Sequence, residues 1–193
     1  MRYSLIREMD ISNGEGIGIA LFVQGCHFHC RGCFNQETWD FNGGKEWTNE
    51  TAKKFIELAN KPYIKRISIL GGEPLADENV TEVYWLINNI LSTYGNNKKI
   101  WLYTGYTIDD FLLDRNFTFF QLASRFKYDY DKTYIYWRKV CSVCLSDVIV
   151  DGQFELDKQD LFNKEIVWAG STNQRIIDVK KSIAKDEIVL YSS

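Results

Sequence analysis

The sequence has little proline or histidine, carries almost no net charge and contains no long apolar run. Only 2 of its 193 residues are proline and 2 are histidine, and the formal charge is −3 at pH 7. A nearly neutral chain has no general attraction to nucleic-acid phosphates or anionic lipids, so we expect neither as a partner. No apolar run approaches the roughly 18 residues of a membrane helix, and no signal-peptide core follows Met1. We therefore expect a cytoplasmic protein.

The composition is typical of one well-packed domain. Hydrophobic residues make up 45% of the chain and aromatic residues 15%. A chain of this length buries roughly 70% of its unfolded surface, so it needs no disulfide or metal to hold its core. We expect a single domain over residues 1–193. Its five cysteines are an odd number, which fits reduced thiols better than a complete set of disulfides.

Short apolar runs that end at glycine alternate with helical patterns. The spacing of apolar residues predicts helices over 48–60 and 79–94. The apolar runs read as buried strands, and they cover 19–23, 67–70, 100–103 and 148–150. This order predicts an α/β fold, a parallel sheet with flanking helices, and a functional site at the carboxyl ends of the strands.

The aromatic stretch 108–139 interrupts the alternation of strands and helices. It mixes charges of both signs with many phenylalanines and tyrosines, and only the part around 119–126 has a helical pattern. We interpret about 112–145 as an insertion into the domain. This aromatic segment is also our first expectation for a surface that contacts a partner protein.

Three cysteines lie on the loop directly after the first predicted strand. Cys26, Cys30 and Cys33 can ligate three irons of a cubane iron–sulfur cluster, which leaves the fourth iron open to a substrate or cofactor. The alternative is a structural zinc site made of the same cysteines with His27 or His29. The first interpretation indicates an enzyme, and the second a non-catalytic interaction module.

A second motif, Gly-Gly-Glu-Pro-Leu at 71–75, directly follows the second predicted strand. Adjacent glycines allow the backbone to approach a ligand closely and to present its amides and carbonyls, and Glu73 adds a fixed acceptor for an ammonium group. The alternative is an ordinary turn, in which glycine and proline only end the strand.

Together the two motifs resemble the signature of radical S-adenosylmethionine enzymes, Cys-x3-Cys-x2-Cys followed by Gly-Gly-Glu-Pro. Further segments resemble, in the same order, the activating proteins of anaerobic ribonucleoside-triphosphate reductase. These segments are 10–14, 21–26, 32–39, 101–107, 150–152 and 170–178. The resemblance runs to about residue 181, leaves 112–145 unmatched, and implies an open, partial β/α barrel.

The resemblance also implies cofactors and the residues that hold them. A four-iron four-sulfur cluster would be bound by Cys26, Cys30 and Cys33, with S-adenosylmethionine on the open iron. The residues expected to contact S-adenosylmethionine are Gly32, Cys33 and Phe34 at the adenine, Gly71, Gly72 and Glu73 at the amino group, and Thr104 and Asp151 at the ribose or carboxylate. Asp151 could equally be a turn residue.

The function that the resemblance implies is activation of the reductase by a radical. A reduced cluster would cleave S-adenosylmethionine to a 5′-deoxyadenosyl radical, which would take a hydrogen atom from a glycine of the large reductase subunit. No catalytic residue is expected beyond the cluster and its S-adenosylmethionine, and the other partner would be a low-potential electron donor. The alternatives are an activase of another glycyl-radical enzyme, of the formate-lyase type, and the zinc-stabilised interaction module.

Two features lie outside the resemblance. The family commonly has Asn-Gly-Pro-Gly with an arginine two residues later, whereas this chain has Glu15 and Gly18 at those two positions. The proline and a fixed cation are thus missing there. Cys141 and Cys144 form an additional pair, which we interpret as two buried thiols; a redox pair and half of a shared metal site are the alternatives.

Overall fold

The computed structural model describes residues 1–160 and 167–192, which form a sheet flanked by helices. Within these described ranges the sheet has seven strands, in the order β3-β1-β2-β4-β5-β6-β7. Their bounds are Arg2–Asp10 (β1), Gly18–Val23 (β2), Lys45–Glu46 (β3), Arg66–Gly71 (β4), Lys99–Tyr103 (β5), Val148–Asp151 (β6) and Arg175–Asp178 (β7). All four strands predicted from apolar runs are present, as β2, β4, β5 and β6.

The sheet is mixed, not parallel throughout. Strands β2, β4, β5 and β6 are parallel to one another, whereas β1, β3 and β7 run antiparallel to their neighbours. The α/β prediction is confirmed, and the prediction of a wholly parallel sheet is wrong at both edges. At the edge formed by β1 the physical reason is connection length, because the short link at 11–17 can join β1 to β2 only as an antiparallel pair, whereas parallel neighbours need a long crossover.

The helices supply those crossovers. Both predicted helices are present, since Thr48 caps α1 by accepting a hydrogen bond from the Thr51 amide, and α2 ends at Gly95, which has φ +53°. The helix bounds are Asn49–Ala59 (α1), Val80–Tyr94 (α2), Asp109–Leu113 (α3), Phe119–Arg125 (α4), Tyr130–Leu145 (α5) and Val179–Lys185 (α6). Short 3-10 helices lie at Gln36–Thr38, Gly95–Asn97, Asp114–Asn116 and Leu156–Lys158. No helix in the described ranges is long and apolar enough to cross a membrane.

The aromatic segment 108–139 contains more helix than its sequence predicted. Helix α4 confirms the prediction around 119–126, but α5 was not predicted. Helix α5 packs against α2 and connects β5 to β6, so it takes the place of a crossover helix. Whether 112–145 is an insertion stays a prediction.

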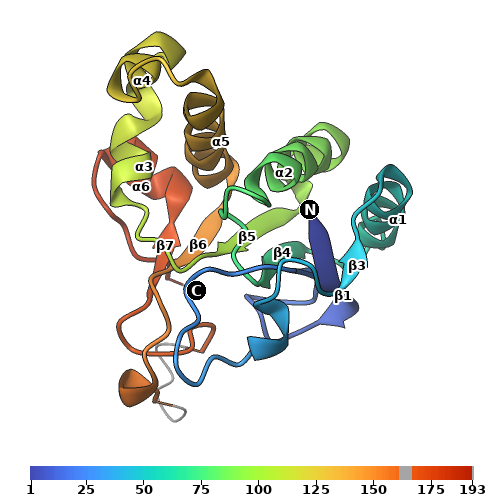
Figure 1. The fold of residues 1–193 in the computed structure, drawn as a ribbon. Helices are drawn as coiled ribbons and strands as arrows, with labels where there is room; N and C mark the ends of the chain where they lie inside the picture. Colours follow the sequence, from blue (N-terminus) through green and yellow to red (C-terminus); the bar gives the residue numbers. More distant parts are fainter. Residues whose placement is uncertain (161–166, 193) are drawn as a thin grey trace.

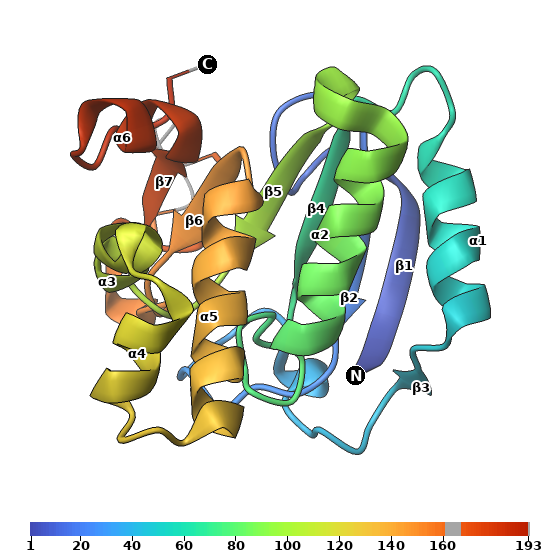
Figure 2. The same cartoon turned by 90° about the horizontal axis from the view of Figure 1, so that it is seen from above.

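The two faces of the sheet have different covers (Figures 1 and 2). Helices α1, α2 and α5 lie on one face, where they bury a large apolar core. The other face carries a smaller cluster of Ala20, Phe22 and Leu70 with Tyr103 packed against it, and the loops around 24–44 and 152–160 lie on this side. We call it the loop face.

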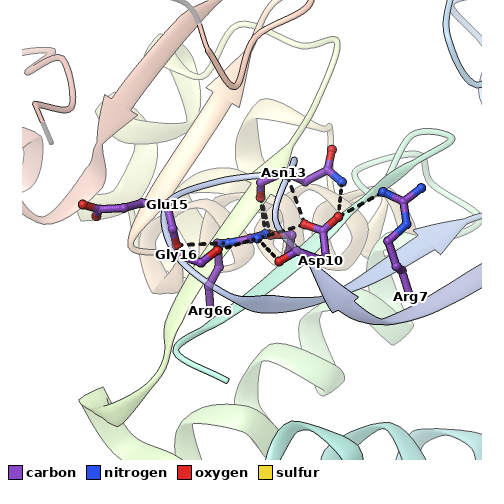
Figure 3. A network of polar contacts seen from close by, with 7 residues as sticks. Arg7, Asp10, Asn13, Glu15, Gly16 and Arg66 are labelled. Carbon is purple, nitrogen blue, oxygen red and sulfur yellow. Dashed lines mark hydrogen bonds and ion pairs between the residues drawn. The ribbon is translucent and has the colours of Figure 1, made fainter. Parts of the chain in front are cut away.

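A buried ion pair fixes the link between β1 and β2 (Figure 3). Arg66 begins β4 and is 1% exposed, and its guanidinium donates to the Asp10 carboxylate at 2.9 Å and to the Asp10 and Gly16 carbonyls. Arg7 and Asn13 also donate to Asp10. Burial alone would raise the pKa of Asp10, but these hydrogen bonds outweigh it and hold the pKa below its ordinary value. The network ties residues 11–17 across the sheet.

We expect Arg66→Met to lower the free energy of unfolding by about 3–5 kcal/mol, because the Asp10 carboxylate would stay buried without its cation. Equilibrium urea denaturation of the purified protein measures this change. Lys61→Met is the matched control, since it removes a cation from the exposed pair of Lys61 and Glu8 and is expected to leave the denaturation midpoint nearly unchanged. Equal midpoints for the two variants would contradict the prediction.

Candidate functional site

A cavity of about 350 Å³ opens on the loop face of the sheet. It extends along the carboxyl ends of β2, β4 and β5 and continues over the loop after β6. Most of the residues predicted for the site line it together, namely Cys26, Cys30, Cys33, Phe34, Gly71, Gly72, Glu73 and Thr104. The structure thus brings the two sequence motifs to one place, as expected for the carboxyl ends of parallel strands.

The loop that carries the cysteines is held at both ends by backbone hydrogen bonds. The amides of Gly25 and Cys26 donate to the carbonyls of Thr38 and Trp39 at 2.7 and 3.0 Å. Gly25 has φ +98°, and a side chain there would collide with the Phe41 ring. These contacts explain why a glycine precedes the first cysteine, and they close 26–38 into a loop over the strand ends.

Backbone amides are directed at the cysteine sulfurs. The amide of Asn35 donates to Cys33 Sγ at 3.4 Å. Burial raises the pKa of Cys26 and of Cys30, while backbone hydrogen bonds at Phe28 and Phe154 act in the opposite direction. Such a half-buried environment with amide donors suits a cysteine that binds a metal. The metal displaces the thiol proton, and the amides stabilise the negative charge on the sulfur.

The two histidines that could complete a zinc site make contacts with other residues. Among residues 1–160 and 167–192, no three His, Cys, Asp or Glu side chains lie close enough together to hold a single metal ion. Zinc needs all four ligands within about 2.3 Å of one point, whereas a cubane takes one thiolate on each of three separate irons. His27 contacts the Glu78 carboxylate at 3.1 Å, and His29 stacks on Trp39 at 4.7 Å, so neither imidazole is held toward the sulfurs.

The two glycines of the second motif allow two loops to pack in direct contact. Gly71 has φ +103°, and a side chain at Gly72 would collide with the Gly25 carbonyl. The amide of Gly72 donates to the Val23 carbonyl and that of Glu73 to the Gly25 carbonyl, at 2.8 and 2.7 Å. These two amides are therefore used within the chain, which differs from our expectation that the motif would present its amides to a ligand.

Glu73 is a fully buried carboxylate at the wall of the cavity. Its Oε1 accepts hydrogen bonds from the Thr104 hydroxyl at 2.7 Å and from the Leu75 amide at 2.8 Å, and its Oε2 accepts one from the Gly105 amide at 2.8 Å. Burial raises the pKa of Glu73 to about 7 in spite of these donors. A cation placed beside it would therefore be strongly favoured, and Thr104 fixes the orientation of the carboxylate.

Two predicted residues are not among those that line the cavity. Asp151 ends β6 and is 1% exposed, and its carboxylate is bound by the Arg175 guanidinium and by the Ile108 amide. Gly32 has φ +75° and lies against Leu156. The contacts of Asp151 join β6, β7 and the loop before α3, and its predicted contact with ribose or carboxylate stays a prediction.

The cavity also has lining residues that the sequence did not single out. They are Arg7, Ser12, Asn13, Phe22, Leu70, Tyr103, Phe154 and Trp168, among others. Phe154 lies two residues after the glycine that follows β6. Because functional residues in such sheets gather at the carboxyl ends of the parallel strands, this position could have been predicted. The residues from β1 and from the link at 11–17 had no such signal, because β1 was not predicted as a strand.

Cys141 and Cys144 lie one helical turn apart in α5 and do not line the cavity. Burial raises the pKa of Cys141 to about 11 and also raises that of Cys144. Both side chains are only partly buried, so the prediction of two buried thiols holds only in part. A thiol with a raised pKa is a poor nucleophile at neutral pH, which speaks against a redox pair.

We expect Cys141→Ser to retain its cofactor and its activity, because the removed thiol lies outside the cavity. The measurement is the iron content and the rate of S-adenosylmethionine cleavage after anaerobic reconstitution. Loss of cleavage with an intact cluster would assign this pair a redox role.

Comparisons with known proteins agree with this site. Residues 12–177 match the family described as a 4Fe-4S single cluster domain. Proteins named anaerobic ribonucleoside-triphosphate reductase-activating protein are similar over nearly the whole chain. The one from Salmonella typhi is 35% identical, over 90% of this chain and 96% of the relative, and that of Enterobacteria phage T4 is 32% identical, over 91% and 93%. The one from Vibrio cholerae is 33% identical, over 91% and 97%. The resemblance found in the sequence is thus confirmed, and the chain belongs to the 4Fe-4S single cluster domain family and, within it, to the anaerobic ribonucleoside-triphosphate reductase-activating proteins.

Proposed function

We propose that this chain activates an anaerobic ribonucleoside-triphosphate reductase by generating a glycyl radical on its large subunit. The observation that carries the proposal is one cavity lined by Cys26, Cys30, Cys33 and Glu73. Family membership and the names of its relatives support the same reaction. The chain would then be a radical S-adenosylmethionine oxidoreductase, and its parallel strands with helices outside them would form the wall of an open, partial β/α barrel.

The three cysteines would hold a four-iron four-sulfur cluster with one open iron. When bound, this cluster supplies the electron that cleaves S-adenosylmethionine to methionine and the 5′-deoxyadenosyl radical, which removes a hydrogen atom from the glycine. The residues present fit the cluster, since each thiol lies at the cavity and amides are directed at the sulfurs. A low-potential electron donor would reduce the cluster from outside, and the cytoplasm would be the compartment.

The cavity wall offers separate contacts for the parts of S-adenosylmethionine. Glu73 would accept hydrogen bonds from the methionine ammonium, with Gly71 and Gly72 allowing the ligand to lie close to the backbone. Phe34 is 60% exposed and packs against Phe154 at 5.2 Å, so its ring is available to the adenine. The backbone of Gly32 and Cys33 would lie on the same side, and Thr104 and Asp151 at the ribose or carboxylate.

The apolar part of the cavity wall excludes water, and it contains no group that we assign to proton transfer. Phe22, Leu70 and Trp168 line the cavity with apolar surface. A radical needs this protection, because thiols and small reductants that enter with the solvent would otherwise quench it. No residue of the chain is assigned an acid or base role, since hydrogen-atom transfer requires neither.

Anaerobic reconstitution tests the proposed function. We expect about four irons and four labile sulfides per chain, reductive cleavage of S-adenosylmethionine, and a glycyl-radical signal in electron paramagnetic resonance when the large reductase subunit is added. One bound zinc without sulfide would support a zinc-stabilised interaction module instead. A radical formed only on an enzyme of the formate-lyase type would support that alternative substrate.

A further inference from the structure

The cavity contains a cation that is set back from the strand ends. Arg7 is the one positively charged side chain among the described residues that line it. It belongs to β1 and pairs with Ala20 of β2, so its side chain lies on the loop face. Ala20 precedes the end of β2 at Val23 by three residues, which is about 10 Å of strand. The main chain of Arg7 therefore lies well before the strand ends, where the loops with the cysteines and with Glu73 begin.

Two contacts hold the Arg7 guanidinium in place. Its Nη1 donates a hydrogen bond to the Asp10 carboxylate at 3.0 Å, and its Cζ lies 5.1 Å from the centroid of the Phe22 ring. The side chain is 43% exposed, so a ligand in the cavity can reach it. Within residues 1–160 and 167–192 the guanidinium donates no further hydrogen bond, which leaves its other N–H groups for a ligand.

The Asp10 carboxylate is shared between two cations. It lies between the guanidinium groups of Arg7 and Arg66, and Arg66 donates to it at 2.9 Å (Figure 3). One carboxylate between two cations leaves one net positive charge. Because Arg66 is buried and Arg7 is not, this charge reaches the cavity at Arg7.

The surroundings of Arg7 suit a carboxylate. A guanidinium can bind the two oxygens of a carboxylate with two parallel hydrogen bonds. Ser12 is exposed and lines the same cavity, so its hydroxyl is a further donor. Phe22 and Leu70 add apolar surface, and apolar surface strengthens an ion pair because it screens charge less than water does.

The carboxylate of S-adenosylmethionine is not available to Arg7 under the proposed function. This cofactor has one anionic group, which is on the same carbon as its ammonium. The ammonium is proposed at Glu73, which follows β4, and β2 lies between β4 and β1. Two strand spacings amount to about 10 Å, so the methionine carboxylate stays beside Glu73 and the cluster. The other molecule that has to enter the cavity is the reductase segment that contains the glycine.

We propose that the Arg7 guanidinium binds a carboxylate of the reductase segment that brings the radical glycine into the cavity. This inference rests on the proposed function and adds to it a binding residue for the protein substrate, together with the charge of the group that it recognises. An ion pair at this point would hold the segment in place while its glycine lies beside S-adenosylmethionine.

The test is Arg7→Met in the full-length, reconstituted protein with S-adenosylmethionine bound. We expect the dissociation constant for the large reductase subunit, measured at equilibrium without reductant, to rise at least about tenfold, as for the loss of a hydrogen-bonded ion pair. Wild-type binding should weaken as the salt concentration rises, and the variant should lose part of this dependence. A purely structural role of Arg7 would not change the salt dependence. Cluster content and the dissociation constant for S-adenosylmethionine should not change.

Lys61→Met is the matched control. The Lys61 side chain is 39% exposed, and it pairs with Glu8, the neighbour of Arg7 on β1, whose side chain points to the opposite face of the sheet. Lys61 does not line the cavity. We expect this variant to bind the reductase and S-adenosylmethionine as the wild type does. Equal weakening in both variants would overturn the inference.

The acidic residues of the reductase near its glycine provide the second half of the test. Each is changed in turn to its amide in the large subunit. One of these changes should weaken binding to the wild type at least about tenfold and have little further effect on binding to Arg7→Met. If no acidic residue of the segment shows this coupling, the inference is wrong.

Two further results would overturn it. One is an Arg7→Met variant that binds the large subunit as tightly as the wild type. The other is a tenfold loss of S-adenosylmethionine affinity with reductase binding unchanged, which would place the methionine carboxylate at Arg7. If the wild type binds the reductase but forms no radical, the proposed function fails, while the binding measurement still decides the role of Arg7. If the wild type forms the radical and the variant is unchanged, only the inference about Arg7 fails.

Discussion

Replacing Cys30 by alanine should abolish cleavage of S-adenosylmethionine. Cys30 is the central cysteine of the loop, and each thiolate of a site-differentiated cubane holds a different iron, so its loss leaves two irons without a protein ligand. No other thiol of the described chain can substitute, because Cys141 and Cys144 lie in α5 and do not line the cavity. We expect the cleavage rate to fall by at least about 100-fold.

The measurement combines iron and sulfide analysis, absorbance near 400 nm and the yield of 5′-deoxyadenosine under reducing conditions. Cys144→Ala is the matched control, since it removes a thiol of similar burial outside the cavity. We expect this control to keep the cluster and the cleavage rate. Full activity in Cys30→Ala would show that the three cysteines do not form the cluster site.

The four central strands could be predicted because parallel strands are covered on both faces. Every residue of β2 is buried, which appears in the sequence as an unbroken apolar run followed by glycine. Strand β1 lacks this signal because it lies near the edge of the sheet, where Leu5 and the three residues 7–9 are exposed. Its charged residues resemble a loop until the pairing with β2 is known.

Helix α5 was missed for a related reason. Its buried residues include Thr133, Lys139 and Ser142 beside Val140 and Val143, so the apolar face that contacts α2 is weakly marked in the sequence. The side chain of Asp129 accepts a hydrogen bond from the Lys132 amide and so caps the helix, but a cap without a clear apolar stripe is a weak signal. Tertiary packing, not periodicity, determines this helix.

The candidate site shows the same division between local and distant information. The cysteine and glycine motifs are local in sequence. They could be predicted to lie together because each follows the carboxyl end of a parallel strand. The partners of each side chain are distant in sequence, since Glu73 is bound by Thr104 and Asp151 by Arg175. Periodicity and spacing contain no information on such pairs.

Gly18 illustrates how a departure from the family pattern can mislead. Because the family commonly has an arginine at this position, the glycine suggested that a fixed cation is missing at the start of β2. In the structure the guanidinium of Arg66 occupies the space beside Gly18, where a side chain would lie only 2.8 Å from the Arg66 Cζ. A cation is therefore present at this position, but β4 contributes it, and a glycine at 18 is required to make room.

Replacing Glu73 by glutamine should weaken the binding of S-adenosylmethionine by at least about thirtyfold. The carboxylate is fully buried, and we propose it as the acceptor for the methionine ammonium, so the loss of its charge removes a desolvated charge pair. The amide also cannot accept on both of its ends, which leaves one of the donors from Thr104, Leu75 or Gly105 without a partner. Isothermal titration of the reconstituted protein measures the affinity.

The same variant should lose a dependence of binding on pH. Burial raises the pKa of Glu73 to about 7 from an ordinary value of 4.5, so without ligand a large fraction is protonated at pH 6 and less at pH 7.5. Because the ammonium favours the carboxylate, affinity should increase as pH rises through this window. For stability the sign is opposite, since the contribution of protonated Glu73 is present below pH 4.5 and is lost as pH rises through about 7.

Glu78→Gln separates these effects from a general change of charge near the site. Glu78 is half exposed and pairs with His27 of the cysteine loop, so the variant removes the same charge without touching the cavity wall. We expect its affinity for S-adenosylmethionine and the slope of affinity with pH to match the wild type. If Glu73→Gln kept the wild-type slope, another group would titrate on binding, and Glu73 could not be the acceptor of the ammonium.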